Sequence, residues 1–196
     1  MSVLLKVEGL EKSFGGVHAA RDVTFEVERG RLIALIGPNG AGKSTTFNMI
    51  GGQLHPDAGR ILLDDVAITG QPPRKIWRQG VGRTFQVAQT FLSMTVVENV
   101  QMALISLARR TLGFWQDAAA IDREGAIALL DRVGMAGQAD RPCRELAYGD
   151  VKRVELAIAL AGNPKLLLMD EPTAGMAPKE RGELMQLTAA IARASG

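Results

Sequence analysis

The sequence predicts an α/β fold, and three observations lead to that prediction. Short apolar and β-branched runs, broken by Gly and Pro, fill the first third of the chain. Apolar residues at helical spacing take over from about residue 95. A further apolar run at residues 166–170 follows the helical part. Strand-like segments on both sides of a helical segment indicate a helical lobe inserted into an α/β core.

Strands are expected near residue 4, near residue 22, and at residues 31–37 and 59–65. The alternation of Val23, Phe25 and Val27 predicts a half-exposed antiparallel sheet, because successive side chains of a strand point to opposite faces. The continuous apolar run at residues 32–36 predicts instead a strand buried on both faces.

The middle of the chain is expected to be helical from about residue 95 to residue 136. A helical pattern resumes over residues 150–161, and the run at 166–170 predicts a second fully buried strand. A final helix is expected from about Pro178 to the end of the chain.

We predict one domain over residues 1–196. Its core lobe is expected to comprise residues 1–87 and 151–196, and its helical lobe residues 88–150.

Composition narrows the classes of function. Hydrophobic residues are 46% and charged residues 22%, which is typical of a globular domain and disfavours disorder. Lys and Arg number 23 against 21 for Asp and Glu, so nothing predicts electrostatic binding of nucleic acid. The single cysteine, Cys143, excludes a disulfide within the chain and any multi-cysteine zinc site, and it favours a reducing compartment. No apolar stretch approaches the roughly 18 residues that span a bilayer.

The strongest functional signal is a glycine-rich loop that fits the pattern G-x-x-x-x-G-K-[ST] in full. Its residues are Gly37, Pro38, Asn39, Gly40, Ala41, Gly42, Lys43, Ser44 and Thr45. The glycines allow successive backbone N–H groups to converge on phosphate oxygens, and the expected helix over residues 45–50 adds its positive end. Lys43 is expected to reach the β- and γ-phosphates, and the Ser44 hydroxyl to bind Mg²⁺. An ordinary glycine-rich turn is the alternative, which the Lys-Ser pair disfavours, so we expect a nucleoside triphosphate as ligand.

The segment that begins at residue 166 ends in two carboxylates, at residues 170 and 171, which complete a candidate hydrolytic site. Asp170 is expected to hold Mg²⁺, directly or through water, and Glu171 to polarise the attacking water. Taken alone, a strand that ends in Asp-Glu is ordinarily a strand that reaches solvent. Together with the phosphate loop, the pair indicates hydrolysis.

Further segments resemble the ATP-binding subunits of ABC transporters, and the resemblance covers essentially the whole chain. Gln86 in Arg-Thr-Phe-Gln resembles the Q-loop of that family, which contacts Mg²⁺ and senses the nucleotide state. Phe14 resembles the aromatic residue that stacks on adenine. Leu-Ala-Tyr-Gly-Asp at residues 146–150 occupies the position of the LSGGQ signature. Glu-Lys-Ser-Phe-Gly-Gly, Gly-Arg-Thr-Phe-Gln and Met-Thr-Val-Val-Glu-Asn-Val are similar to the branch that serves branched-chain amino acid uptake.

The resemblance implies a P-loop NTPase fold of the ABC ATPase type, with an N-terminal antiparallel sheet and an inserted helical subdomain. It also implies a C-terminally incomplete cassette, because the family places a switch histidine after a strand that lies beyond Gly196. ATP and Mg²⁺ are the implied ligands. Two such domains close head to tail in the family, so Ala147 and Gly149 of one copy are expected to face the γ-phosphate bound by the other.

Three positions depart from the family's pattern. Ala147 lacks the hydroxyl of the usual Ser, and Asp150 replaces a neutral Gln. We expect Asp150 to turn inward and act as the N-cap of the helix behind it. Ala177 stands where the D-loop ordinarily closes with Asp, which implies altered communication between the two sites.

The expected function is ATP hydrolysis that energises an ABC importer for branched-chain amino acids. The implied partners are a second ABC ATPase subunit, as a homodimer or a heterodimer, and transmembrane permease subunits that contact residues 86–100. The chain is then expected in the cytoplasm at the inner face of the cell membrane, reaching the membrane only through the permease and binding no nucleic acid. Two alternatives stay open: a truncated ATP-binding module with weak or no hydrolysis, and a soluble ABC ATPase without a transport role.

Overall fold

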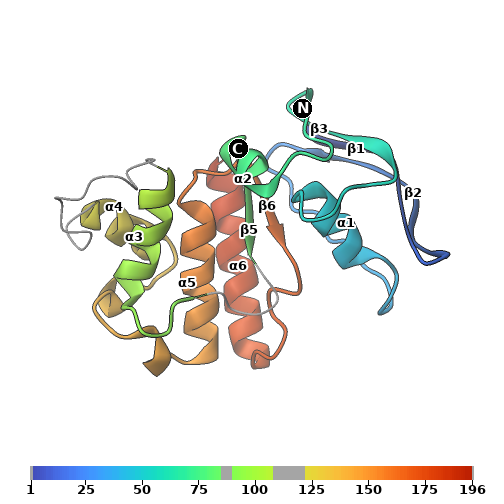
Figure 1. The fold of residues 1–196 in the computed structure, drawn as a ribbon. Helices are drawn as coiled ribbons and strands as arrows, with labels where there is room; N and C mark the ends of the chain where they lie inside the picture. The colour runs from blue at the N-terminus through green and yellow to red at the C-terminus, as the bar shows by residue number, and fades with distance from the viewer. Residues whose placement is uncertain (1, 85–89, 108–121, 196) are drawn as a thin grey trace. The chain divides into compact units, whose positions relative to one another are not determined.

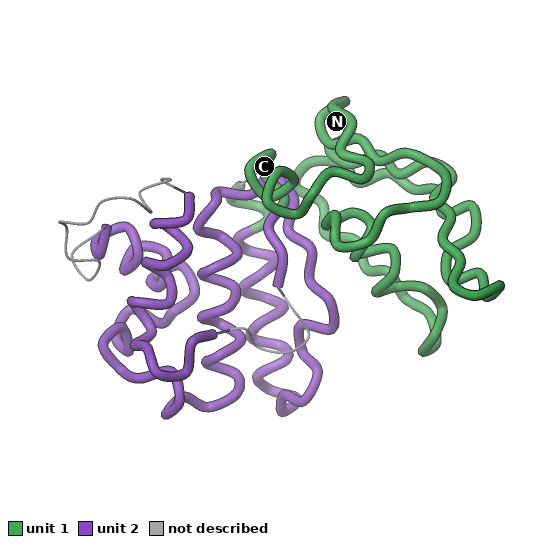
Figure 2. Tube along the Cα trace, in the orientation of Figure 1, with its two compact units in different colours: residues 1–81, 192–196 green, residues 82–191 purple. Residues whose placement is uncertain are grey.

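The computed structural model describes residues 2–84, 90–107 and 122–195. The chain forms two compact units, one of residues 1–81 with 192–196 and the other of residues 82–191 (Figure 2). The expected division into a core lobe and a helical lobe remains a prediction.

The first unit is built on a four-stranded sheet in the order β2-β1-β3-β4 (Figure 1). The central strand β1 (Val3–Phe14) pairs antiparallel with β2 (Val17–Glu28) on one side and with β3 (Ala58–Leu63) on the other. The short edge strand β4 (Val66–Ala67) pairs antiparallel with β3. The predicted antiparallel sheet is therefore confirmed.

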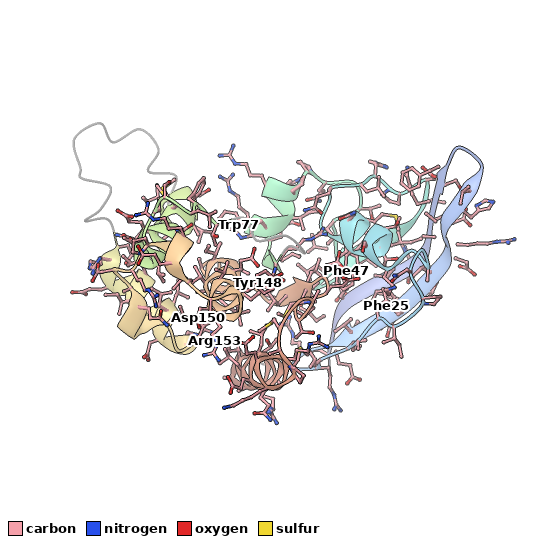
Figure 3. All side chains as sticks on the ribbon, turned by 90° about the horizontal axis from the view of Figure 1, so that it is seen from below. Phe25, Phe47, Trp77, Tyr148, Asp150 and Arg153 are labelled. Atoms are coloured by element: carbon pink, nitrogen blue, oxygen red, sulfur yellow. The ribbon has the colours of Figure 1, made fainter. Side chains whose placement is uncertain are left out.

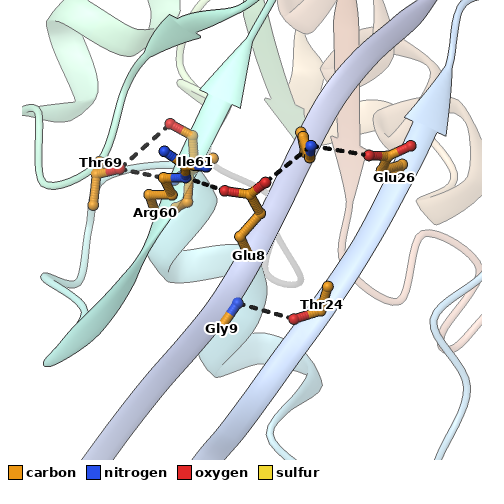
Figure 4. A network of polar contacts seen from close by, with 8 residues as sticks. Glu8, Gly9, Thr24, Glu26, Arg60, Ile61 and Thr69 are labelled. Carbon is orange, nitrogen blue, oxygen red and sulfur yellow. Dashed lines mark hydrogen bonds and ion pairs between the residues drawn. The ribbon is translucent and has the colours of Figure 1, made fainter.

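One face of this sheet is buried and the other carries charge. Phe25 and Val27 on β2 are more buried than their exposed neighbours Thr24 and Glu26, as the alternation predicts. On the charged face, Glu8 of β1 accepts hydrogen bonds from Lys6 and from Arg60 of β3 (Figure 4). Apolar side chains of the unit that are almost wholly buried are Leu5, Val7, Leu10, Met49, Ile61, Ile68 and Ile76.

Two helices complete the first unit: α1 (Lys43–Ile50) and α2 (Pro73–Arg78). Helix α1 follows the glycine-rich loop and buries Met49 and Ile50. Helix α2 begins with a proline, a residue that suits the first turn because its missing N–H would have no partner there.

The apolar run at residues 32–36 differs from its prediction. Residues 31–38 form no strand, and the run is exposed, most strongly at Ile36, which is 89% exposed. A strand is buried on both faces only where neighbouring strands and covering layers enclose it. No strand among the described residues pairs with this run, so its apolar composition alone does not make it a buried strand.

The second unit joins a two-stranded sheet to a set of helices. Strands β5 (Val81–Thr84) and β6 (Leu166–Met169) pair with each other. The helices are α3 (Val96–Leu107), α4 (Arg123–Arg132), α5 (Tyr148–Leu160) and α6 (Pro178–Ser195), with short 3₁₀ turns η2 (Ala136–Gln138) and η3 (Cys143–Glu145). Their shared core includes Val96, Val97, Val100, Leu130, Val133, Met135, Val154, Leu156, Leu160 and Leu184.

Local sequence explains where two of these helices begin. At the start of α3, the Glu98 carboxylate accepts the Thr95 N–H at 2.7 Å, and Thr95 Oγ1 accepts the Glu98 N–H at 3.4 Å. This reciprocal pair is a capping box. At the start of α4, the Asp122 carboxylate accepts the Gly125 N–H at 3.2 Å.

Two predictions for the second unit need correction. Helix α5 begins at Tyr148, earlier than the expected residue 150. Strand β6 is confirmed, but it alternates between buried and half-buried side chains and is not fully buried. The final helix from Pro178 is confirmed. Within the ranges that the structure describes, no helix combines the length and the apolar character needed to cross a bilayer.

Candidate functional site

The glycine-rich loop of the first unit takes a backbone shape that only glycine allows at its last bend. Gly40 and Gly42 have φ of 84° and 79°, whereas Gly37 has no positive φ. A Cβ atom on Gly42 would lie 1.9 Å from the carbonyl oxygen of Ala19 on β2. Gly42 therefore lets the loop pass directly against the sheet and turn into α1.

Lys43 closes this loop on itself. Its Nζ donates to the carbonyl oxygen of Gly37 at 2.8 Å and to that of Pro38 at 2.7 Å. The N–H of Ala41 also donates to the Pro38 carbonyl, at 3.2 Å. The loop thus wraps around a single ammonium group, which places a positive charge among its backbone groups.

The first turn of α1 is suited to an anion. Its N-cap is Gly42, which has no side chain to accept the first N–H groups of the helix. Those N–H groups carry the positive end of the helix dipole, and the Lys43 ammonium adds a full charge. Thr46 stiffens the turn, since its Oγ1 donates to the Gly42 carbonyl at 3.0 Å. The residues present therefore fit the phosphates of a nucleotide.

The other predicted residues of the loop sit where its pattern requires. Pro38, Asn39 and Ala41 lie in the exposed loop, while Ser44 and Thr45 lie in the first turn of α1. The hydroxyl of Ser44 is a hard oxygen ligand of the kind that Mg²⁺ accepts. The described residues contain no group of three or more His, Cys, Asp or Glu that could hold a metal by itself.

Phe14 ends β1 in the same unit and is 49% exposed. The Nζ of Lys12 lies 5.6 Å from the centroid of its ring, within cation–π range. Asp57 holds this segment, because its carboxylate accepts Lys12 Nζ at 2.6 Å and the Ser13 N–H at 2.8 Å. Sequence patterns missed Asp57, since nothing in the sequence pairs it with a lysine so far along the chain.

In the second unit, Asp170 follows β6 and is only 8% exposed. The Nη2 of Arg83 on β5 lies 3.9 Å from its Oδ2. Burial lowers the pKa of Arg83 below its usual value, and the charge of Asp170 opposes that change. Arg83 is a second residue whose role sequence patterns missed at this site. Its pairing with Asp170 depends on the fold, which brings two distant segments together.

Glu171 is exposed and has φ of 46°, in the left-handed region that a residue with a Cβ seldom adopts. Its carbonyl accepts the N–H of Ala174 at 3.0 Å, which folds the following residues into a turn. A strained backbone next to a buried carboxylate is a feature often found at functional sites.

The segment at residues 146–150 starts α5 differently from its prediction. The N-cap is Ala147, whose backbone is extended, and its side chain offers no capping bond. Asp150 lies inside the first turn, where its carboxylate accepts Gln138 Nε2 at 3.4 Å. The expected capping role of Asp150 is therefore wrong, because the extended backbone that an N-cap needs falls at Ala147. An acidic residue in the first turn still complements the helix dipole.

Each unit brings part of the predicted site together. The first unit collects the phosphate loop at residues 37–45. The second places Gly149 against the turn after β6: a Cβ on Gly149 would lie 3.4 Å from Met176 Cε and 3.3 Å from Glu180 Oε2. Gln86 lies outside the described residues, so its predicted role stays a prediction.

Comparisons with known proteins agree with these motifs. Residues 20–174 match the family described as ABC transporter. The high-affinity branched-chain amino acid transport ATP-binding protein LivG of Escherichia coli is 42% identical over 197 residues, covering 96% of this chain and 76% of that protein. The corresponding protein BraF of Pseudomonas aeruginosa is 39% identical over 199 residues, with the same coverage of 96% and 76%.

A solved structure extends the agreement to the fold. The crystal structure of an ATP-binding cassette of an ABC transporter in its ADP conformation matches with a TM-score of 0.87 and 32% identity. The match covers 100% of this chain and 79% of that one. The predicted α/β fold of the ABC ATPase type is confirmed, and the chain belongs to the ABC transporter family, among relatives that are ATP-binding subunits for branched-chain amino acid transport.

Proposed function

We propose that this chain hydrolyses ATP to energise an importer of branched-chain amino acids. The observation that carries the proposal is the closed loop around Lys43, whose ammonium is held by the carbonyls of Gly37 and Pro38 at the start of α1. Such a loop is suited to a polyphosphate, and relatives that are 42% and 39% identical over 96% of this chain are named for branched-chain amino acid transport.

Each predicted residue has a defined task in this proposal. The backbone N–H groups from Gly40 to Ser44 and the Lys43 ammonium hold the β- and γ-phosphates. Ser44, Asp170 and Gln86 supply protein oxygens for Mg²⁺, which neutralises the phosphate charge when it is bound.

Two further groups act on the base and on the attacking water. Phe14 offers its exposed ring to adenine. Glu171 accepts a proton from the attacking water or orients it, which its exposed position at the end of β6 allows.

The proposal includes partners. The exposed loop needs a group that excludes water from the γ-phosphate, and the start of α5 offers one from a second ABC ATPase subunit. Ala147 and Gly149 of that subunit would present their backbone N–H groups to the phosphate. Transmembrane permease subunits would contact the segment around residues 86–100 and hold the assembly at the inner face of the membrane.

Phosphate release by the purified chain, alone and in complex with its permease, tests hydrolysis. Glu171→Gln should lower turnover by about 100-fold or more while leaving ATP binding intact, because it removes the base and not the phosphate loop. Glu124→Gln is the matched control, since Glu124 is an exposed glutamate on α4 and its change should leave turnover unaltered. Equal turnover in Glu171→Gln and the unaltered chain would contradict the proposal.

Transport is tested separately in vesicles that contain the chain and its permease. ATP should drive labelled leucine toward the side of the membrane on which this subunit lies. Labelled lysine is the control for substrate class, and Glu171→Gln is the control for coupling. Movement of leucine away from this side would contradict import.

A further inference from the structure

Tyr148 links the start of α5 to the turn that follows Glu171. It is the first residue of α5, and Figure 3 shows its side chain on that helix. A Cβ atom on Gly175 would lie 3.4 Å from Tyr148 Cε1 and 3.9 Å from Cζ. The ring therefore lies beside Gly175, on the side that a Cβ atom would occupy, at ordinary van der Waals distance from that atom. Gly175 has φ of 77°, so a residue with a side chain would be strained there.

The turn beyond Glu171 is anchored at both ends but not in its middle. Asp170 is buried at one end and Met176 at the other. Between them, the Ala174 N–H donates to the Glu171 carbonyl at 3.0 Å and the Met176 N–H to the Thr173 carbonyl at 3.2 Å. Gly175 lies between these bonds with no side chain of its own. The atoms that an ideal Cβ on Gly175 would meet within 4 Å belong to the Tyr148 ring, so the ring limits movement of Gly175 in that direction.

The ring also lies near a buried charge. Lys152 lies one helical turn further along α5, and its Nζ is 5.6 Å from the centroid of the Tyr148 ring. Lys152 is itself held by Glu155, whose Oε2 lies 2.9 Å from Nζ in surroundings where both side chains are almost wholly buried. A cation held by a buried ion pair thus lies within cation–π range of the ring.

Packing of the core does not account for the ring. Tyr148 is 45% exposed and is not one of the residues that form or pack against the shared core of this unit. Its hydroxyl has no hydrogen-bond partner in the part of the chain that the structure describes. The contact that distinguishes the ring is the approach of its Cε1 and Cζ atoms to Gly175.

From these contacts we infer that Tyr148 is a positioning residue, which holds Gly175 and through it the turn that carries Glu171. The inference rests on the proposed function, because it concerns the placement of the glutamate that acts on water. It also connects, within one subunit, the start of α5, which is proposed to face the phosphate bound by the second subunit, with Glu171: a group that binds at the start of α5 would act on Glu171 through this ring.

Hydrogen exchange tests the inference without any catalysis. In Tyr148→Ala, the amides of Ala174 and Met176 should exchange about 10-fold faster, because the turn loses its support and opens more often. Tyr148→Phe keeps the ring and should exchange like the unaltered chain. Amides in the middle of α4 serve as the internal control for global unfolding. Unchanged exchange at Ala174 and Met176 in Tyr148→Ala would overturn the inference, whether or not the chain hydrolyses ATP.

Kinetics provide the second readout. Tyr148→Ala should lower kcat about 10-fold with KM for ATP unchanged, because Glu171 is displaced while the phosphate loop of the first unit is untouched. Tyr148→Phe should restore kcat, and Met102→Ala, an exposed apolar residue on α3, should match the unaltered chain. A loss in Tyr148→Phe as large as that in Tyr148→Ala would overturn the inference by assigning the effect to the hydroxyl. Absence of hydrolysis in the unaltered chain would instead count against the proposed function, and the exchange experiment would still decide on Tyr148.

Discussion

The ammonium of Lys152 lies 2.9 Å from Glu155 Oε2 inside helix α5, where the two residues are only 4% and 6% exposed. A buried ion pair is costly to break, because removal of one partner leaves the other charge without compensation in a medium that solvates it poorly. The Lys152 ammonium of this pair also lies 5.6 Å from the centroid of the Tyr148 ring. We therefore expect the pair to be important both for the stability of the second unit and for the shape of its site.

Loss of one charge should destabilise the chain more than loss of both. Glu155→Leu alone should lower the free energy of unfolding by about 3–5 kcal/mol, because the buried Lys152 ammonium loses the carboxylate that lies 2.9 Å from it. The double change Lys152→Met with Glu155→Leu should recover most of that loss. Urea titration followed by circular dichroism measures both values. A double variant that is less stable than Glu155→Leu would show that the charges contribute through other partners.

The two glycines of the phosphate loop with positive φ should differ in their tolerance of a methyl group. Gly40→Ala meets open space, so it should cost only the backbone strain of about 1–2 kcal/mol. Gly42→Ala adds a collision with the Ala19 carbonyl, and should cost about 1–3 kcal/mol more. Urea titrations of the two variants without nucleotide provide the comparison. Equal losses of unfolding free energy in the two variants would mean that the loop can move away from β2 without a loss of stability.

Features that lie within one continuous segment of the chain can be predicted from the sequence, whereas contacts between distant segments cannot. The phosphate loop is predictable because all its chemistry lies within residues 37–45. The antiparallel sheet is predictable because Val23, Phe25 and Val27 alternate with polar residues. The pairing of Asp57 with Lys12 is not, because it depends on the path of the chain between them. The start of α5 was misplaced because capping propensity favours Asp150, whereas the backbone becomes extended at Ala147.

Burial is the other property that local composition does not determine. The apolar run at residues 32–36 has the composition of an enclosed strand, but enclosure is supplied by other segments. None of the described strands pairs with it, and its side chains are exposed. The half-buried Leu167 of β6 illustrates the same limit, because its neighbours in space and not in sequence set its exposure.

Asp57 should affect nucleotide affinity through Phe14. Its carboxylate holds Lys12 and the Ser13 backbone, and these hydrogen bonds lower the pKa of Asp57 below its usual value. Asp57→Asn should weaken ATP binding by about 3- to 10-fold, because the segment before the aromatic ring loses a charge-assisted anchor. Fluorescence titration with a labelled nucleotide measures this change.

Two comparisons separate this effect from a general loss of charge. Asp65→Asn is the matched control, since Asp65 is an exposed aspartate in the same unit. In a Phe14→Ala background, Asp57→Asn should have little further effect, because the two changes act through one contact. Additive losses in the double variant would show that Asp57 acts elsewhere.

Acid should weaken the first unit through Glu8. Hydrogen bonds from Arg60 and then Lys6 lower the pKa of Glu8 from 4.5 to about 2 (Figure 4). Because the pKa is lower in the folded chain, the ionised carboxylate stabilises the fold above about pH 4.5, and this stabilisation is lost as the pH falls toward 2. Glu8→Gln removes the ionisable carboxylate and with it this dependence of stability on pH. The urea midpoint of the unaltered chain should therefore exceed that of Glu8→Gln at pH 7, and the difference should shrink steadily between pH 4.5 and 2.

Glu11→Gln, on the same strand, should show no such convergence. Because Lys6 and Arg60 are largely exposed, added salt should reduce the difference at pH 7, and a difference that is independent of both pH and salt would rule out the ion pairs as its source.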